Sequence, residues 1–172
     1  MMCLSKGITG GYLPLSVVLT TDEIYDAFYD DYATMKAFLH SHSYSGNPLA
    51  CAVAVEVLNI FEDEKILEKM PPKESFLDRQ AERFTELSHV GEFRRCGMVA
   101  AFELVEKKED NTPYPWQERK GREVFRKALE RGALLRPLGN VVYFMPPLTT
   151  EEETLRELAD IAYDCIVEVT GS

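Results

Sequence analysis

The stretch that decides the fold lies at the start of the chain: Leu4-Ser5-Lys6-Gly7-Ile8-Thr9-Gly10-Gly11-Tyr12-Leu13-Pro14-Leu15. Lys6 follows a short apolar run, which predicts the end of a strand, and three glycines come within the next five residues. Glycine permits left-handed backbone and close approach to a ligand. A lysine amine that loses its proton adds to an aldehyde. The stretch predicts a Schiff-base lysine at position 6, although by itself the pattern also fits a solvated lysine in a glycine-rich turn.

Apolar periodicity predicts a helical middle for the chain. We expect a strand over 15–20, a short helix capped by Thr21, and a loop over 30–36. Asn47-Pro48 is a helix start, and the helix predicted over 49–63 is apolar on most sides, which indicates burial. Met70-Pro71-Pro72 is expected to break the helical pattern before it resumes over 73–88, with Phe76, Leu77, Phe84 and Leu87 on one side.

From Val90 onward the pattern predicts strand, strand, helix, strand, strand, helix. Residues 90–95 and 98–105 flank Cys96-Gly97, and a charged loop follows over 106–115. A helix is predicted over 117–131, with Val124, Phe125, Ala128 and Leu129 inward and Gly132 at its end. Short strands over 134–136 and 141–145 precede a last helix, for which Thr150 to Glu153 form a capping box. This order favours helices packed on a small antiparallel sheet.

Composition excludes several classes of protein. The chain has 172 residues, 45% of them hydrophobic, and a formal net charge of -10, which argues against nucleic acid or an anionic membrane as a partner. No apolar run is long enough to span a bilayer, and there is no signal peptide pattern. The four cysteines are scattered without metal-site spacing, which favours a reducing, cytoplasmic location and no structural zinc.

Two further stretches, in order along the chain, carry a resemblance together with Ser5 to Leu15. They are His40-Ser41-His42-Ser43-Tyr44-Ser45-Gly46-Asn47-Pro48-Leu49-Ala50-Cys51-Ala52 and Leu135-Arg136-Pro137-Leu138-Gly139-Asn140-Val141-Val142-Tyr143-Phe144-Met145-Pro146-Pro147. All three are similar to signature segments of class III aminotransferases, which depend on pyridoxal 5'-phosphate. The resemblance covers only the part of that family from its lysine to the C-terminus. We therefore expect a fragment whose first strand lacks its usual neighbours.

The resemblance implies an α/β fold, the C-terminal portion of a fold-type I transaminase. Residues 1–46 would be the end of the large cofactor-binding domain, with the Schiff-base lysine. Residues 47–88 would be linking helices, and residues 89–172 an α+β small domain with an antiparallel sheet. It also implies a homodimer for the full-length protein.

The resemblance assigns roles to four residues. Lys6 would hold pyridoxal phosphate and act as the proton-transferring base. Ser43, with His42 beside it, would bind the cofactor phosphate across the dimer interface; a turn serine is the plainer alternative. Arg136 would receive the substrate carboxylate, for which a guanidinium fork is suited, although it also fits a surface arginine at a strand end. His40 and His42 have the spacing of metal ligands, but no third ligand is near in the sequence, and we predict no metal site.

Within the family, the segments around Lys6 and Arg136 are most similar to members that pass an amino group from S-adenosylmethionine to 8-amino-7-oxononanoate in biotin biosynthesis. An omega-amino-acid or polyamine transaminase is the alternative of the same class. A different reading is a non-catalytic C-terminal dimerisation module. Since the family places its remaining cofactor contacts upstream of the lysine, we expect the isolated chain to be inactive.

Overall fold

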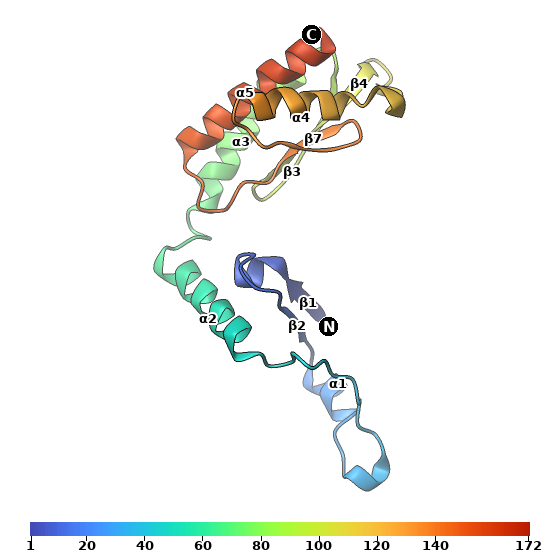
Figure 1. Cartoon of the computed structure of the whole chain (residues 1–172), viewed down its shortest axis with the longest axis vertical. Coiled ribbons are helices and arrows are strands. Elements are labelled where there is room, and N and C mark those ends of the chain that lie inside the picture. The colour runs from blue at the N-terminus through green and yellow to red at the C-terminus, as the bar shows by residue number, and fades with distance from the viewer. The chain divides into compact units, whose positions relative to one another are not determined.

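The computed structural model describes residues 1–172 and divides into two compact units, residues 1–65 (unit 1) and 66–172 (unit 2). Figure 1 shows the elements of each unit along the chain. Unit 1 holds two of the signature segments and unit 2 the third. The predicted division into residues 1–46, 47–88 and 89–172 refers to the domains of the full-length family members, and it stays a prediction.

Unit 1 is built on a two-stranded antiparallel hairpin. Strand β1 (Met2–Ser5) pairs with β2 (Ser16–Leu19), with Ser5 opposite Ser16. A 3-10 helix, Lys6–Thr9, starts directly after β1. The short helix α1 (Asp22–Asp26) follows with Thr21 at its N-cap, as predicted, and a 3-10 turn over Tyr32–Thr34 lies in the predicted loop.

Helix α2 (Pro48–Asp63) completes unit 1 and begins where the sequence indicated. The Asn47 side chain accepts a hydrogen bond from the backbone N–H of Leu49 at 3.0 Å, which satisfies one unpaired donor of the first turn. The predicted burial of this helix is wrong for this chain. Only Ala50 and Ala54 are buried, whereas Leu49, Val55 and Leu58 are more than half exposed.

Unit 2 contains an antiparallel sheet in the order β3-β4-β7-β6. Its strands are β3 (Val90–Cys96), β4 (Val99–Lys107), β6 (Arg136–Leu138) and β7 (Val141–Phe144). Three lie close to the predicted ranges, whereas β6 begins at the last residue of the strand predicted over 134–136. A short strand, β5 (Thr112–Pro113), pairs with β4 inside the segment predicted to be loop. The α+β layer predicted from the element order is confirmed.

Three helices cover one face of this sheet (Figure 1): α3 (Met70–Thr85), α4 (Lys120–Glu130) and α5 (Glu152–Thr170). The alternate residues Ala100, Phe102 and Leu104 of β4 are buried, and the ring of Phe102 stacks on Phe84 of α3 at 4.1 Å. This period-two burial is what one covered face requires. The four apolar residues predicted on one side of the helix over 73–88 are all buried, although α3 ends at Thr85 and Leu87 lies beyond it.

Three details differ from expectation. Pro71 and Pro72 lie in the first turn of α3 and begin this helix, because a first-turn proline loses no intrahelical hydrogen bond. Leu129 of α4 is 52% exposed, since the buried stripe runs through Val124 and Ala128. No capping box starts α5: its N-cap is Glu151, without a side-chain hydrogen bond.

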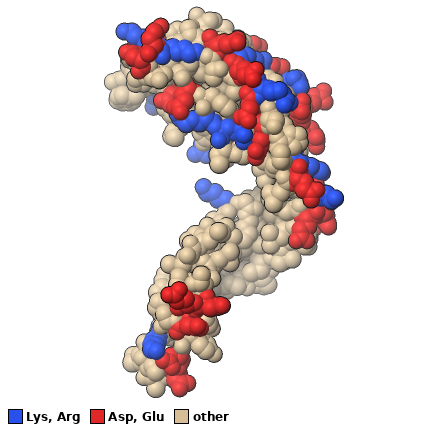
Figure 2. Space-filling view, turned by 180° about the vertical axis from the view of Figure 1, so that it is seen from behind, with Lys and Arg blue, Asp and Glu red and all other residues tan.

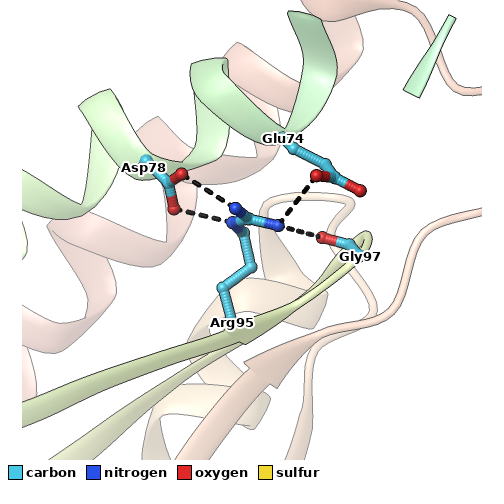
Figure 3. A network of polar contacts seen from close by, with 4 residues as sticks. All are labelled: Glu74, Asp78, Arg95 and Gly97. Carbon is cyan, nitrogen blue, oxygen red and sulfur yellow. Dashed lines mark hydrogen bonds and ion pairs between the residues drawn. The ribbon is translucent and has the colours of Figure 1, made fainter. Parts of the chain in front are cut away.

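A polar network ties α3 to the β3–β4 hairpin (Figure 3). The Arg95 guanidinium donates to both carboxylate oxygens of Asp78, at 2.6 and 2.9 Å, and to the Gly97 carbonyl at 3.2 Å. Glu74 lies 3.3 Å from the same guanidinium. Hydrogen bonding to Arg95 holds the pKa of Asp78 below its usual value. The hairpin turn is thereby fixed to the helix.

Candidate active-site residues

Lys6 occupies an unusual backbone position. It is the first residue of the 3-10 helix after β1 and has a left-handed φ of 52°, which is uncommon for a residue other than glycine. Its side chain is exposed. The loop beyond it is fixed by Thr9, which is buried and donates through Oγ1 to the Leu13 carbonyl at 2.6 Å. Strained backbone held by its surroundings is frequent at functional sites.

A cavity of about 490 Å³ adjoins this loop and unites the first two signature segments. Ser5 and Ser16 contribute from the hairpin, and His42, Tyr44 and Ser45 contribute from the second segment. The second segment forms a turn, in which the His42 N–H donates to Ser45 Oγ at 3.2 Å and the Ser45 N–H donates to the His42 carbonyl at 3.0 Å. Two stretches that are far apart in the sequence, Ser5 to Ser16 and His42 to Gly46, thus line one cavity.

The structure separates the two predicted cofactor residues of this segment. His42 lines the cavity, whereas Ser43 is exposed and does not line it. Ser45, which the sequence did not single out, lines the cavity together with Ser5, Ser16 and Tyr44. The rings of His40 and His42 are 5.8 Å apart, edge to face. No group of three or more His, Cys, Asp or Glu side chains is arranged to hold a metal ion.

Arg136 belongs to a larger groove in unit 2, with a volume of about 850 Å³. It begins β6 and pairs in register with Tyr143 of β7, so that the two side chains are neighbours on the sheet. Trp116, Phe125, Leu134 and Met145 give the groove an apolar lining. An arginine beside an apolar channel is suited to a carboxylic acid with an aliphatic chain.

The groove also contains residues that the sequence did not identify. Arg119 and Arg122 of the α4 N-terminal region line it together with Trp116, the only tryptophan of the chain. Arg122 and Arg126 lie four residues apart on α4, and Arg119 directly precedes this helix. That spacing was visible in the sequence, but it does not tell which groove the arginines border.

Close packing fixes the position of α4 against the strand that carries Arg136. A Cβ on Gly121 would overlap the carbonyl oxygen of Gly139 and lie 3.0 Å from Pro137 Cβ. Only a glycine lets the first turn of α4 approach the β6–β7 turn this closely.

The predicted site residues fall in both units, with Lys6, His42 and Ser43 in unit 1 and Arg136 in unit 2.

The chain belongs to the class III aminotransferases: the sequence model of the aminotransferase class-III family matches residues 1–166. Members of this family use pyridoxal phosphate as their cofactor. No helix combines the length and apolar character that a bilayer crossing requires.

Several relatives share one name. The adenosylmethionine-8-amino-7-oxononanoate aminotransferase of Anoxybacillus flavithermus is 45% identical over 99% of this chain, and that of Aquifex aeolicus is 48% identical over 92%. The solved structure of the Methanocaldococcus jannaschii enzyme of that name superposes with a TM-score of 0.93 at 43% identity, over 96% of this chain. The chain spans only 35 to 38% of the length of these proteins. The fold-type I transaminase assignment is thus confirmed for the part compared.

Proposed function

We propose that this chain supplies the Schiff-base lysine and the carboxylate-binding arginine of a pyridoxal-phosphate-dependent aminotransferase. The reaction would transfer an amino group from S-adenosylmethionine to 8-amino-7-oxononanoate and give 7,8-diaminononanoate, in biotin biosynthesis. The observation that carries the proposal is the left-handed backbone of Lys6 directly after Ser5, which lines a cavity with several hydroxyl groups; Lys6 itself does not line it. The names of the relatives support the choice of substrates.

The residues around the cavity fit a phosphorylated pyridine aldehyde. Ser5, Ser16, Tyr44 and Ser45 offer hydroxyl donors, and His42 an imidazole, all of which suit phosphate oxygens. Ser43 remains our proposal for a phosphate ligand in the full-length homodimer, where its exposed hydroxyl would reach a site outside this cavity. When bound, the cofactor supplies an electron sink that stabilises negative charge on the substrate carbon.

Lys6 performs two tasks in this proposal. Its Nζ would hold the cofactor through the aldehyde in the resting enzyme, and once the amino donor has displaced it, the same nitrogen would accept a proton from the substrate carbon and release it again. The left-handed backbone at Lys6 sets the direction in which the side chain leaves the loop. The packed Thr9 and Leu13 contact keeps that direction constant.

Arg136 fixes the other end of the acceptor. Its guanidinium binds the carboxylate of 8-amino-7-oxononanoate as a bidentate fork, and the apolar lining beside it accommodates the aliphatic chain. Binding at the far end orients the ketone carbon that receives the amino group.

Covalent labelling tests the assignment of Lys6. The purified chain is incubated with pyridoxal phosphate and reduced with borohydride, and the adducts are mapped by mass spectrometry. Lys65 is the matched control, because it is also an exposed lysine of unit 1 with a left-handed φ, of 51°. We expect several-fold more label on Lys6 than on Lys65, and loss of that excess in Lys6→Ala but not in Lys65→Ala. Equal labelling of the two lysines would contradict a preformed site at Lys6.

A further inference from the structure

The groove that contains Arg136 has an unusual charge balance. Three arginines line it, Arg119, Arg122 and Arg136, and no aspartate or glutamate does. The chain as a whole carries 29 acidic residues against 19 basic ones. Figure 2 shows acidic and basic side chains intermixed over much of unit 2. A groove whose charged residues are all arginines is therefore a local departure from the acidic composition of the protein.

These arginines also lack partners. Five of the ten arginines of the chain form ion pairs with carboxylates: Arg83, Arg94, Arg95, Arg131 and Arg156. Three of the other five line the groove. Glu118 and Glu123 border an adjoining depression of about 140 Å³ with Arg119 and Arg122, but neither carboxylate comes within 4.0 Å of an arginine. The charge in the groove is thus not neutralised by the protein itself.

The placement of Arg119 and Arg122 is built into the fold. Arg119 has a left-handed φ of 54° at the junction between the 3-10 helix Trp116–Glu118 and α4, and Arg122 follows three residues later. Gly121 between them packs on the Gly139 turn that follows Arg136. One close contact therefore holds both arginine-bearing segments beside the same groove.

We propose that Arg119 and Arg122 form an anion-attracting subsite that selects negatively charged, aliphatic substrates for the groove of Arg136. The inference rests on the proposed function, in which Arg136 binds a carboxylate. An anion that approaches a protein of net charge -10 is repelled on average, and arginines without carboxylate partners oppose this repulsion at the groove. Arg136 pairs with the carboxylate, and the positive charges of Arg119 and Arg122 raise the affinity of the groove for anions by long-range electrostatic attraction.

Ligand binding to the chain can be followed by the fluorescence of Trp116, because the only tryptophan lines the groove. Nonanoate serves as the anionic probe and nonan-1-ol as its uncharged counterpart. The test variant is Arg119→Gln/Arg122→Gln, and Arg119→Lys/Arg122→Lys keeps the charge. Arg126→Gln is the matched control, since Arg126 lies on the same helix, has no carboxylate partner and does not line the groove. Arg136→Gln tests the proposed function separately.

At low salt we expect the Gln double variant to raise the Kd for nonanoate about threefold to tenfold, in line with the loss of two nearby charges in water-exposed surroundings. The difference should shrink at about 0.5 M salt, because the Debye length falls to a few Å. The Lys double variant should bind as the wild type does, and nonanol should not discriminate among the proteins. A merely structural role would not produce this dependence on salt and charge.

The outcomes separate the two claims. An unchanged Kd for nonanoate in the Gln double variant, with a raised Kd in Arg136→Gln, would overturn the subsite and leave the proposed function standing. An unchanged Kd in Arg136→Gln would overturn the role of Arg136 itself. An equal loss of nonanoate and nonanol binding would show that the arginines shape the groove and would refute charge selection. An effect of Arg126→Gln as large as that of the double variant would refute the localisation to the groove.

Discussion

The close contact at Gly121 predicts that Gly121→Ala destabilises the protein, although alanine has a higher helix propensity than glycine. In an unstrained helix, replacing glycine by alanine stabilises by about 1 kcal/mol. At Gly121 the new methyl group would overlap the Gly139 carbonyl oxygen, a backbone atom that cannot rotate away. Overpacking of this kind costs about 1–3 kcal/mol, and we place Gly121→Ala at the upper end. The net expectation is a loss of about 1–2 kcal/mol in the free energy of unfolding.

Thermal unfolding followed by far-UV circular dichroism measures this change, because α3, α4 and α5 of unit 2 contribute much of the helical signal. For a unit of this size, a loss of 1–2 kcal/mol lowers the midpoint by roughly 5–10 °C. Gly7→Ala is the control, since a Cβ there meets nothing within 4 Å and the φ of Gly7 is not left-handed. A higher midpoint for Gly121→Ala would refute the close packing of α4 on the β6–β7 turn.

Two further predictions concern titratable groups. The pKa of Asp78 is lowered in the folded state, so its pairing with Arg95 stabilises above the unfolded pKa near 4 and is lost as pH falls through the lower folded value. Asp78→Asn should therefore unfold more easily at pH 7, by roughly 0.2–1 kcal/mol for so exposed a pair. In urea titrations the difference from the wild type should shrink as the pH falls below about 4; a difference that stays constant over this range would exclude the ion pair as its cause. Cys165 is buried, and burial raises the pKa of its thiol, whereas the other three cysteines are exposed. A thiol reagent should modify Cys3, Cys51 and Cys96 in the native chain and Cys165 only after unfolding, and mass mapping of a rapidly modified Cys165 would contradict the packing of α5.

Local patterns predicted most of the elements because neighbouring residues determine them. The alternation from Met98 to Leu104 marks the covered face of β4, and Asn47-Pro48 marks the start of α2. The capping box at Thr150 failed for an equally local reason. The Thr150 N–H donates to the Pro147 carbonyl at 3.0 Å, and this turn places Thr150 one residue before the N-cap. A sequence motif for a cap competes with the turn that precedes it.

The sequence indicated some residues of the candidate site and missed others. Resemblance to a family pointed to Lys6 and Arg136, and the structure supplies a cavity next to Lys6 and a groove around Arg136. Their chemical roles are still proposals. The sequence did not identify Ser45 or Trp116, because a hydroxyl or an indole becomes part of a site only when distant segments meet. Contacts between distant segments are part of the tertiary structure, and a local sequence pattern does not predict them.

The exposed side of α2 shows the same limit in energetic terms. Ala50 and Ala54 are buried in unit 1, and a Cβ placed on Gly10 would lie 3.7 Å from Cγ2 of Val57. Leu49, Val55 and Leu58 on its other sides remain exposed, although the apolar pattern predicts burial there as strongly. The periodicity of apolar residues indicates how much apolar surface a helix carries, and therefore how much free energy its burial would contribute. It does not indicate which residues pack against that surface. The same limit applies to the charged residues Arg119 and Arg122. The sequence shows two arginines at the start of α4, and only the structure shows that both border the groove of Arg136, beside the contact between Gly121 and the Gly139 turn.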